Sequence, residues 1–215
     1  MPEAGPRPLQ NRAAPSGEIV AVSARGLFMG NRGVLHDDNK QLGRRRWVLK
    51  AWLICQLDFK GRHRDVMTPR RYTELFFFDE AAAIAAGHRP CFECRRPAAL
   101  AWRDAWGSAQ NLTTPPRAGE MDFVSHEERV DPRTRAQKRW VGGVDDLPDG
   151  AFVSIEDQPH LVWGDAVLPW SWSGYGPRAK RPRGEQIEVL TPPGAAAVLR
   201  EGYQPILHPS AMAEA

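Results

Sequence analysis

Two cysteines, Cys91 and Cys94, are separated by two residues and lie between two segments with helical patterns. On the N-terminal side, Asp79 is a suitable N-cap for the alanine-rich segment "EAAAIAA", and Gly87 is a natural place for that helix to end. On the C-terminal side, Pro97 suits the first turn of a second helix, "AALAWRDAWGSA". This order of elements predicts a rigid turn that presents both thiols on one side of the chain.

A Cys-x-x-Cys turn lets two thiolates reach one ion at about 2.3 Å, the usual Zn–S distance. The N-terminus of the following helix lowers thiol pKa values through its dipole, which favours metal binding. A structural zinc site needs four ligands, and the chain has no second Cys-x-x-Cys pair. We expect the missing ligands to come from Cys55, His88 or His36, with His63, His126 or a carboxylate as further candidates.

Two other interpretations of the cysteine pair stay open. A redox couple of the thioredoxin type would follow a strand, whereas here a helix and a glycine turn come first. Unliganded thiols are the second alternative, and Cys55 lies in an apolar strand pattern where a cysteine is usually a small buried side chain. We interpret the pair as a zinc site.

The composition is that of an ordinary globular protein, with 42% hydrophobic and 26% charged residues among 215. Three cysteines are few, and an odd number cannot all pair, so a secreted disulfide framework is not expected. No apolar run approaches the roughly 18 residues of a membrane span, and the N-terminus lacks the pattern of a secretory signal. We therefore predict a soluble, cytoplasmic protein with no membrane partner.

The net charge of +3 is distributed unevenly. Residues 44–103 hold 13 basic and 6 acidic residues, a net charge of +7, and arginine outnumbers lysine there by 11 to 2. The planar guanidinium group binds phosphate better than an ammonium group does. This segment therefore favours a polyanionic partner, although a solvated basic surface would have the same composition.

The pattern of strands, helices and turns predicts an α+β fold. Its N-terminal half would contain a zinc knuckle, a strand hairpin and two short helices, and a small β-rich half would follow. In the hairpin, "RRWVLKAWLICQLDF" would form a long strand, and "RRYTELFFFD" the next one. The predicted parts are a disordered tail over 1–17, a basic zinc-binding region over 18–110, a linker and charged segment over 111–146, a β-rich region over 147–208 and a tail over 209–215.

The segment "FFFDEAAAIAAGHRPCFECRRP" resembles the end of the zinc-binding domain of Ada-type DNA repair proteins. The matching positions are Ala86, Gly87, Arg89, Pro90, Cys91, Cys94 and Arg95. The resemblance covers about 22 residues and implies a zinc-knuckle fold, DNA contact and a role in DNA repair or processing. In that family two further cysteines lie upstream, one of which accepts a methyl group from a DNA phosphotriester. Here Cys55, 36 residues before Cys91, is the upstream cysteine, which makes it a candidate methyl acceptor.

The stretch "VLPWSWSGYGPRAKRPRG" places aromatic residues that can stack on bases next to a basic loop that can hold phosphates. Filling the core of a small β-domain is an equal explanation for these aromatic residues. The candidate nucleic-acid-binding residues of the whole chain are Arg32, Arg62, Arg64, Arg89, Arg95, Arg96, Trp172, Tyr175 and Arg181.

The stretch "SHEERVD" places His126 beside Glu127, and we consider both as candidate catalytic groups of a metal-dependent enzyme. A charged helix face would show the same spacing. Our first hypothesis is a zinc-binding protein that binds nucleic acid, with DNA as the expected partner. The alternative is a metal-containing hydrolase or transferase for a small anionic substrate, in which Arg32, His36 and Asp37 converge with the carboxylates of this stretch.

Overall fold

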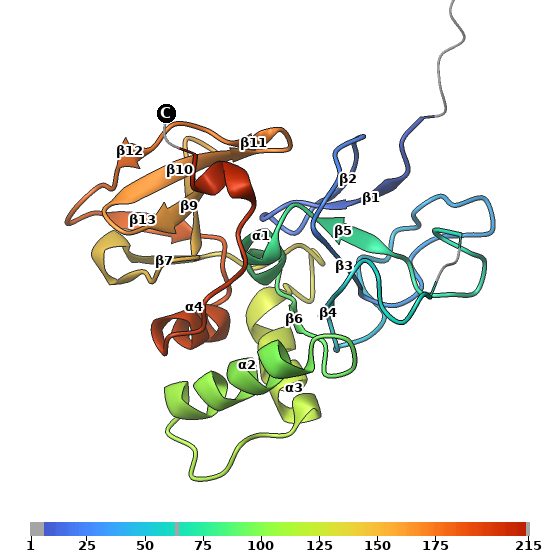
Figure 1. The fold of residues 1–215 in the computed structure, drawn as a ribbon, viewed down its shortest axis with the longest axis horizontal. Helices are drawn as coiled ribbons and strands as arrows, with labels where there is room; N and C mark the ends of the chain where they lie inside the picture. The colour runs from blue at the N-terminus through green and yellow to red at the C-terminus, as the bar shows by residue number, and fades with distance from the viewer. Residues whose placement is uncertain (1–6, 63–64, 214–215) are drawn as a thin grey trace, which may run out of the picture.

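The computed structural model describes residues 7–62 and 65–213, which form two β-sheets and four α-helices (Figure 1). This confirms the prediction of an α+β fold. The first sheet has the strand order β2-β1-β5-β3-β4-β6. Its strands are β1 (Gln10–Ala13), β2 (Ile19–Ala21), β3 (Phe28–Asn31), β4 (Leu53–Cys55), β5 (Leu75–Phe77) and β6 (Arg89–Pro90).

The second sheet is antiparallel and has the order β11-β10-β9-β8-β13-β7, with β12 paired to β10. Its hairpin between β8 and β9 turns at Glu156 and Asp157, which both have positive φ, as a two-residue type I′ turn requires. The strands are β7 (Trp140–Gly143), β8 (Phe152–Ile155), β9 (Gln158–Trp163), β10 (Ala166–Ser171), β11 (Gly174–Tyr175), β12 (Ala179–Lys180) and β13 (Gln186–Val189).

Helix α1 (Glu80–Ala85) lies between the two sheets and packs against both β5 and β8 (Figure 1). All of its residues are buried, because an alanine-rich helix is narrow enough to fit between two layers. As predicted, the Asp79 carboxylate caps it by accepting a hydrogen bond from the Ala82 amide at 2.8 Å. Gly87 follows it with a φ of +85°, a conformation that favours glycine. This helix joins the two sheets into one core.

Three further helices lie below the sheets in Figure 1: α2 (Arg96–Ala109), α3 (Ala118–Arg129) and α4 (Pro193–Arg200). The sequence predicted α2 and the pairing of Trp102 with Trp106, which are both buried one turn apart. Helix α4 packs against α2 and α3. Two short 3₁₀ helices complete the fold: η1 (Val144–Asp146) and η2 (Pro209–Ala211).

Regular structure also occurs in segments that the sequence predicted as tails and linker. Strand β1 lies within the range 1–17, and its Ala13 is fully buried. Helix α3 lies within 111–146, and its Met121 is fully buried in the core. The 3₁₀ helix η2 lies within 209–215. These segments contribute to the same core as the two sheets.

The predicted long strand over 45–59 is wrong, because only β4 forms there. Before it, the amides of Val48 and Leu49 both donate to the carbonyl of Arg32, and the Trp52 indole donates to the carbonyl of Leu49, so the chain turns instead of extending. The expected hairpin of this strand with the next is also absent, since β3 lies between β4 and β5. The long connections on both sides of β4 are irregular, and they line the cavities described below.

None of the helices in the ranges 7–62 and 65–213 has the length and apolar character needed to cross a membrane.

Candidate metal centre

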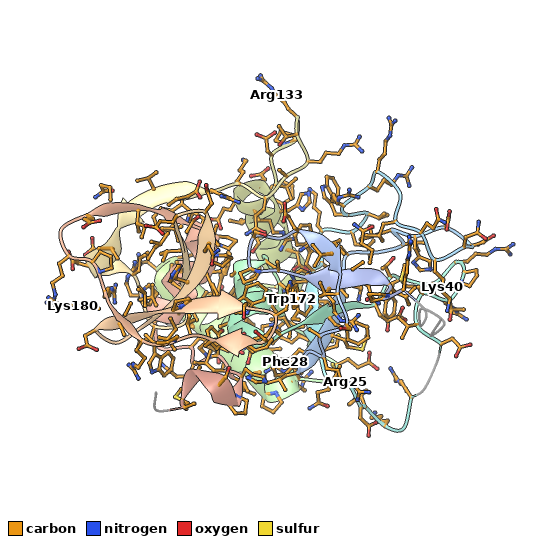
Figure 2. The ribbon with its side chains drawn as sticks, turned by 90° about the horizontal axis from the view of Figure 1, so that it is seen from above. Arg25, Phe28, Lys40, Arg133, Trp172 and Lys180 are labelled. Carbon is orange, nitrogen blue, oxygen red and sulfur yellow. The ribbon has the colours of Figure 1, made fainter. Side chains whose placement is uncertain are left out.

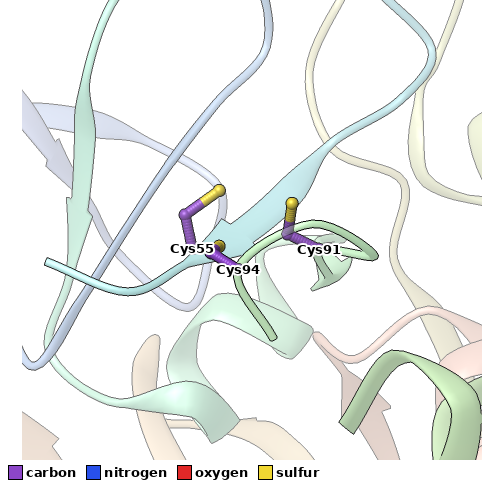
Figure 3. Close-up of side chains that lie close together, drawn as sticks. All are labelled: Cys55, Cys91 and Cys94. Atoms are coloured by element: carbon purple, nitrogen blue, oxygen red, sulfur yellow. The ribbon is translucent and has the colours of Figure 1, made fainter. Parts of the chain in front are cut away.

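Three cysteines from distant parts of the sequence meet at the end of the first sheet (Figure 3). Cys55 is the last residue of β4, and Cys91 directly follows β6. These two strands pair in parallel, and the amide of Cys91 donates to the carbonyl of Ile54 at 3.0 Å. Parallel strands end at the same edge of a sheet, so this register brings Cys55 to Cys91 although 36 residues separate them.

The turn between β6 and α2 brings the third sulfur, that of Cys94, to the same place (Figure 3). Two hydrogen bonds hold this turn over residues 91–95, which we call the knuckle: the Glu93 amide donates to Cys91 Sγ at 3.4 Å, and the Arg95 amide donates to the Cys91 carbonyl at 3.0 Å. Helix α2 begins at the next residue, with a proline in its first turn. The turn is therefore fixed at both ends, by a strand and by a helix.

The three Sγ atoms lie within 4.8 Å of one another. In a tetrahedral zinc site with Zn–S bonds of about 2.3 Å, neighbouring sulfurs are about 3.8 Å apart, so small side-chain rotations would bring this cluster to zinc geometry. Cys91 is buried, and the other two are half-buried. Within residues 7–62 and 65–213, this is the one group of three or more ligand side chains close enough to share an ion.

The thiols interact strongly with one another. The hydrogen bond from Cys55 lowers the pKa of Cys91 to about 5 and also lowers the pKa of Cys94, while the same bonds raise the pKa of Cys55. Amide donors contribute as well, from Glu93 to Cys91 and from Gln56 to Cys94. The three sulfurs thus share their protons through hydrogen bonds, and a divalent cation that displaced those protons would be held by three thiolate ligands. The residues present therefore fit a soft cation such as Zn²⁺.

A cavity of about 410 Å³ opens beside the sulfurs. Residues of β3, β5 and the connection between β4 and β5 form its walls, and most of these residues are apolar. Glu74, Glu93 and Arg62 add charged groups, of which Arg62 and Glu93 form an exposed ion pair at 2.8 Å. The Glu74 carboxylate is held by the Met67 amide at 2.8 Å. A fourth ligand position facing this cavity would be accessible to a small molecule.

Two buried ion pairs anchor the residues next to the cysteines of the knuckle. Arg95 makes a two-point bond to Glu80 of α1, at 2.7 and 2.9 Å, and its guanidinium lies 4.4 Å from the ring of Phe28. Arg89 makes a similar bond to Asp122 of α3, at 2.8 and 2.7 Å. All four charged side chains are nearly inaccessible to solvent. Such pairs fix orientation, because each charge needs its partner in place.

The two predicted histidine ligands lie elsewhere. His88 is buried against Trp52 and Phe77, and its Nε2 accepts a hydrogen bond from Arg32. Burial lowers its pKa well below the usual value. His36 is within hydrogen-bond distance of Thr73 Oγ1, at 2.7 Å. In the described parts of the chain, neither belongs to the cysteine group, and the candidate His63 lies outside those parts.

The two predicted catalytic groups are on α3. The ring of His126 is buried against Trp47, with ring centroids 4.3 Å apart, and burial lowers its pKa to about 4. Glu127 is exposed on the same helix. Neither residue lines the cavity next to the cysteines. The methyl-acceptor candidate Cys55, by contrast, is one of its lining residues.

Three of the predicted phosphate contacts are interior residues. Arg89 and Arg95 are bound to carboxylates as described, and Arg32 is 2% exposed and donates to backbone carbonyls. Guanidinium groups in these positions do not face a surface that DNA could follow. Arg62 and Arg96 are exposed, as a phosphate contact requires, and Arg64 lies outside the described residues.

The aromatic and basic candidates of the second sheet have structural contacts. Tyr175 is buried, and its hydroxyl donates to Asp79 at 2.8 Å. Trp172 is half-buried, edge-on to Trp170 with ring centroids 4.9 Å apart. The Arg181 guanidinium donates to the backbone carbonyls of Val144, Leu147 and Gly164. Trp172 and Arg181 retain partial access to solvent, whereas Tyr175 is buried.

The sequence interpretation missed the residues that line the cysteine cavity, such as Phe59, Glu74 and Glu93. They come from three separate segments, and no spacing in the sequence connects them with the cysteines. A site with three neighbouring cysteine sulfurs and an adjoining cavity defines a candidate metal-binding protein. Comparisons with protein-family models, curated proteins and solved structures find no match for this chain.

Proposed function

We propose that this protein binds zinc through Cys55, Cys91 and Cys94 and uses the metal centre in a reaction on nucleic acid, in DNA repair or processing. The observation that carries the proposal is the approach of three sulfurs to within 4.8 Å of one another at the edge of a cavity. Three protein ligands and one accessible position are typical of catalytic zinc, whereas purely structural zinc has four protein ligands.

The cavity supports a reactive rather than a buried structural centre. When bound, Zn²⁺ would supply Lewis acidity at its fourth position and keep the thiolates ionised at neutral pH. The carboxylates of Glu74 and Glu93 line the same cavity and are candidates for holding or moving a proton. Arg62 lies at the same wall and would attract an anionic substrate.

The local resemblance to Ada-type proteins suggests a specific reaction for Cys55. Its sulfur would attack the methyl carbon of a methyl phosphotriester, forming an S–C bond while the C–O bond breaks and the phosphodiester leaves with the electron pair. This assignment requires a half-buried sulfur that faces a cavity, which Cys55 provides. It also requires a thiolate, which metal coordination would supply.

Nucleic-acid binding is supported by exposed arginines rather than by the buried ones. Arg62 and Arg96 flank the knuckle, and Arg44, Arg45 and Arg46 are exposed on the connection between β3 and β4. Phosphate neutralisation by such residues releases counterions and makes binding salt-dependent.

The size of the cavity favours a second candidate function. A space of about 410 Å³ is large enough for a small molecule but too small for a nucleic-acid strand. The alternative is therefore a hydrolase or transferase in which the same three cysteines hold zinc and a small anionic substrate enters next to Arg62. Turnover of a small phosphate ester or amide, with no binding of oligonucleotides, would favour it.

The first test is metal analysis of the purified full chain, together with Cys55→Ser, Cys91→Ser and Cys94→Ser variants. About one zinc per chain, reduced in each variant and retained in a His36→Asn control, is expected. Fluorescence anisotropy with single- and double-stranded oligonucleotides at several salt concentrations tests the nucleic-acid part. Binding that does not weaken with salt, or no binding at all, would refute that part and leave the metal centre standing.

A further inference from the structure

A second cavity, of about 290 Å³, has four arginines among its lining residues and shares no lining residue with the cysteine cavity. Arg32 and Trp52 line it, together with the turn that contains Glu18. The loop between α3 and β7 contributes two further arginines, Arg135 and Arg139. The basic run before β4 contributes Arg46. Among the residues that the structure describes, four arginines and one glutamate therefore line one small space.

Arg32 is the unusual member of this group, because no carboxylate in the described parts of the chain pairs with its buried charge. It is 2% exposed, and its three hydrogen bonds go to neutral acceptors: the carbonyl of Gly17 at 3.2 Å, the carbonyl of Ala86 at 3.2 Å and His88 Nε2 at 3.3 Å. A guanidinium has five N–H groups, so these bonds leave two for another acceptor. Burying a charge is costly unless a counter-charge compensates it.

A second buried guanidinium increases the positive charge at this place. Arg129 is 1% exposed and donates to the carbonyls of Gly87 and Lys50. Both it and Arg32 lie over the ring of Trp52, at 4.1 and 4.0 Å from the ring centroid. Burial, and then repulsion by Arg129 and Arg46, lowers the pKa of Arg32 to about 9.

The other lining arginines differ in their partners. Arg139 is bound to Glu188 at 2.6 Å, so its charge is partly neutralised. Arg46 is exposed and donates to the backbone carbonyl of Gly43 at 2.7 Å. Arg135 is exposed at the mouth and also lines a neighbouring cavity that contains Arg44 and Arg45. The mouth is therefore positive as well, and would attract an anion toward the floor at Arg32.

We propose that this cavity binds a phosphate group, held at its floor by Arg32 and at its mouth by Arg46 and Arg135. Guanidinium groups bind phosphate through paired, charge-assisted hydrogen bonds, and a cavity of this size holds a phosphate with a small attached group. The phosphate can belong to a free molecule, such as a nucleotide or inorganic phosphate, or to the end of a nucleic-acid strand. The proposal does not depend on the metal centre.

The test is isothermal titration calorimetry of the full chain with inorganic phosphate, with adenosine monophosphate, and with one oligonucleotide carrying either a 5′-phosphate or a 5′-hydroxyl. Arg46→Ala and Arg135→Ala should each weaken binding about tenfold, as expected for the loss of one charge-assisted contact. Arg133→Ala is the matched control. This arginine lies on the same loop but points away from the body of the protein in Figure 2, and it lines none of the cavities described.

The two sources of phosphate give different results. Tighter binding of the 5′-phosphorylated oligonucleotide than of its 5′-hydroxyl form and of the mononucleotide identifies a strand end, whereas equal or tighter binding of the small molecules identifies a free ligand. Absence of binding by all phosphate ligands would overturn the proposal. So would equal effects of the cavity and control substitutions. Cys55→Ser should bind phosphate as the unchanged protein does, so failure of the metal proposal is distinguishable from failure of this one.

Discussion

Replacing Glu80 by glutamine tests how the buried ion pairs stabilise the knuckle. The Glu80 carboxylate is 1% exposed and accepts four hydrogen bonds: two from Arg95, one from the Tyr203 hydroxyl at 2.6 Å and one from the Ile206 amide at 2.9 Å. Glutamine has the same shape as glutamate, but its amide nitrogen is a hydrogen-bond donor. In either orientation of the amide, this nitrogen would face groups that donate to the carboxylate in the unchanged protein. The substitution also leaves the charge of Arg95 buried without its partner.

The expected loss follows from those contacts. Removing one partner of a buried ion pair usually costs about 3–5 kcal/mol, and we expect about 3 kcal/mol for Glu80→Gln because one oxygen remains as an acceptor. Chemical denaturation in urea measures it. With an m-value of about 3 kcal/mol/M for a chain of this size, the midpoint should fall by roughly 1 M.

Glu188→Gln is the matched control, because the same change is made in an ion pair with Arg139 that is about 40% exposed. Exposed pairs contribute about 0–1 kcal/mol, so the midpoint of this variant should hardly change. The difference between the two variants should persist when a chelator removes metal, since neither residue is a proposed ligand. Equal losses in the two variants would refute the assignment of Glu80 as a buried anchor of the knuckle.

Two further predictions concern protonation and backbone conformation. The pKa values of His88 and His126 are lower in the folded protein than the usual value near 6.5, so the unfolded chain binds protons more readily. The free energy of unfolding should therefore be highest above about pH 6.5 and fall as the pH drops toward 4. His126→Phe should make urea midpoints less dependent on pH. Gly87→Ala should lower the thermal midpoint more than Gly164→Ala does. Both glycines have positive φ, but a Cβ at Gly87 would approach the Arg129 side chain to 2.6 Å, whereas one at Gly164 meets nothing within 4 Å. Equal shifts would argue against a tight contact at Gly87.

Local signals in the sequence predicted the elements whose structure is locally determined. Asp79 and Gly87 mark the ends of α1, and Pro97 marks the start of α2, because caps and turn residues act within one helical turn. The prediction of a long strand over 45–59 was wrong because a contact distant in the sequence determines the backbone there. The Arg32 carbonyl, about 16 residues away, accepts two amide hydrogen bonds there and turns the chain.

The candidate site was predictable only in part. Cysteine spacing identified Cys91 and Cys94, and Cys55 was named because it is the one remaining cysteine of the sequence. The parallel pairing of β4 and β6, which brings Cys55 to the other two, could not be predicted from any sequence pattern. Charge counting placed Arg89 and Arg95 among phosphate contacts, although both are buried against carboxylates. A basic residue looks the same in the sequence whether it faces solvent or a distant Glu or Asp.

We infer that one zinc ion is held by three cysteines with a fourth position open toward the cavity. X-ray absorption spectroscopy at the zinc edge on the purified full chain tests it directly. The expected result is one zinc per chain with three sulfur neighbours at about 2.3 Å and one oxygen or nitrogen neighbour at about 2.0–2.2 Å. Zinc with fewer than three sulfur neighbours, or a chain that takes up no zinc, would contradict it.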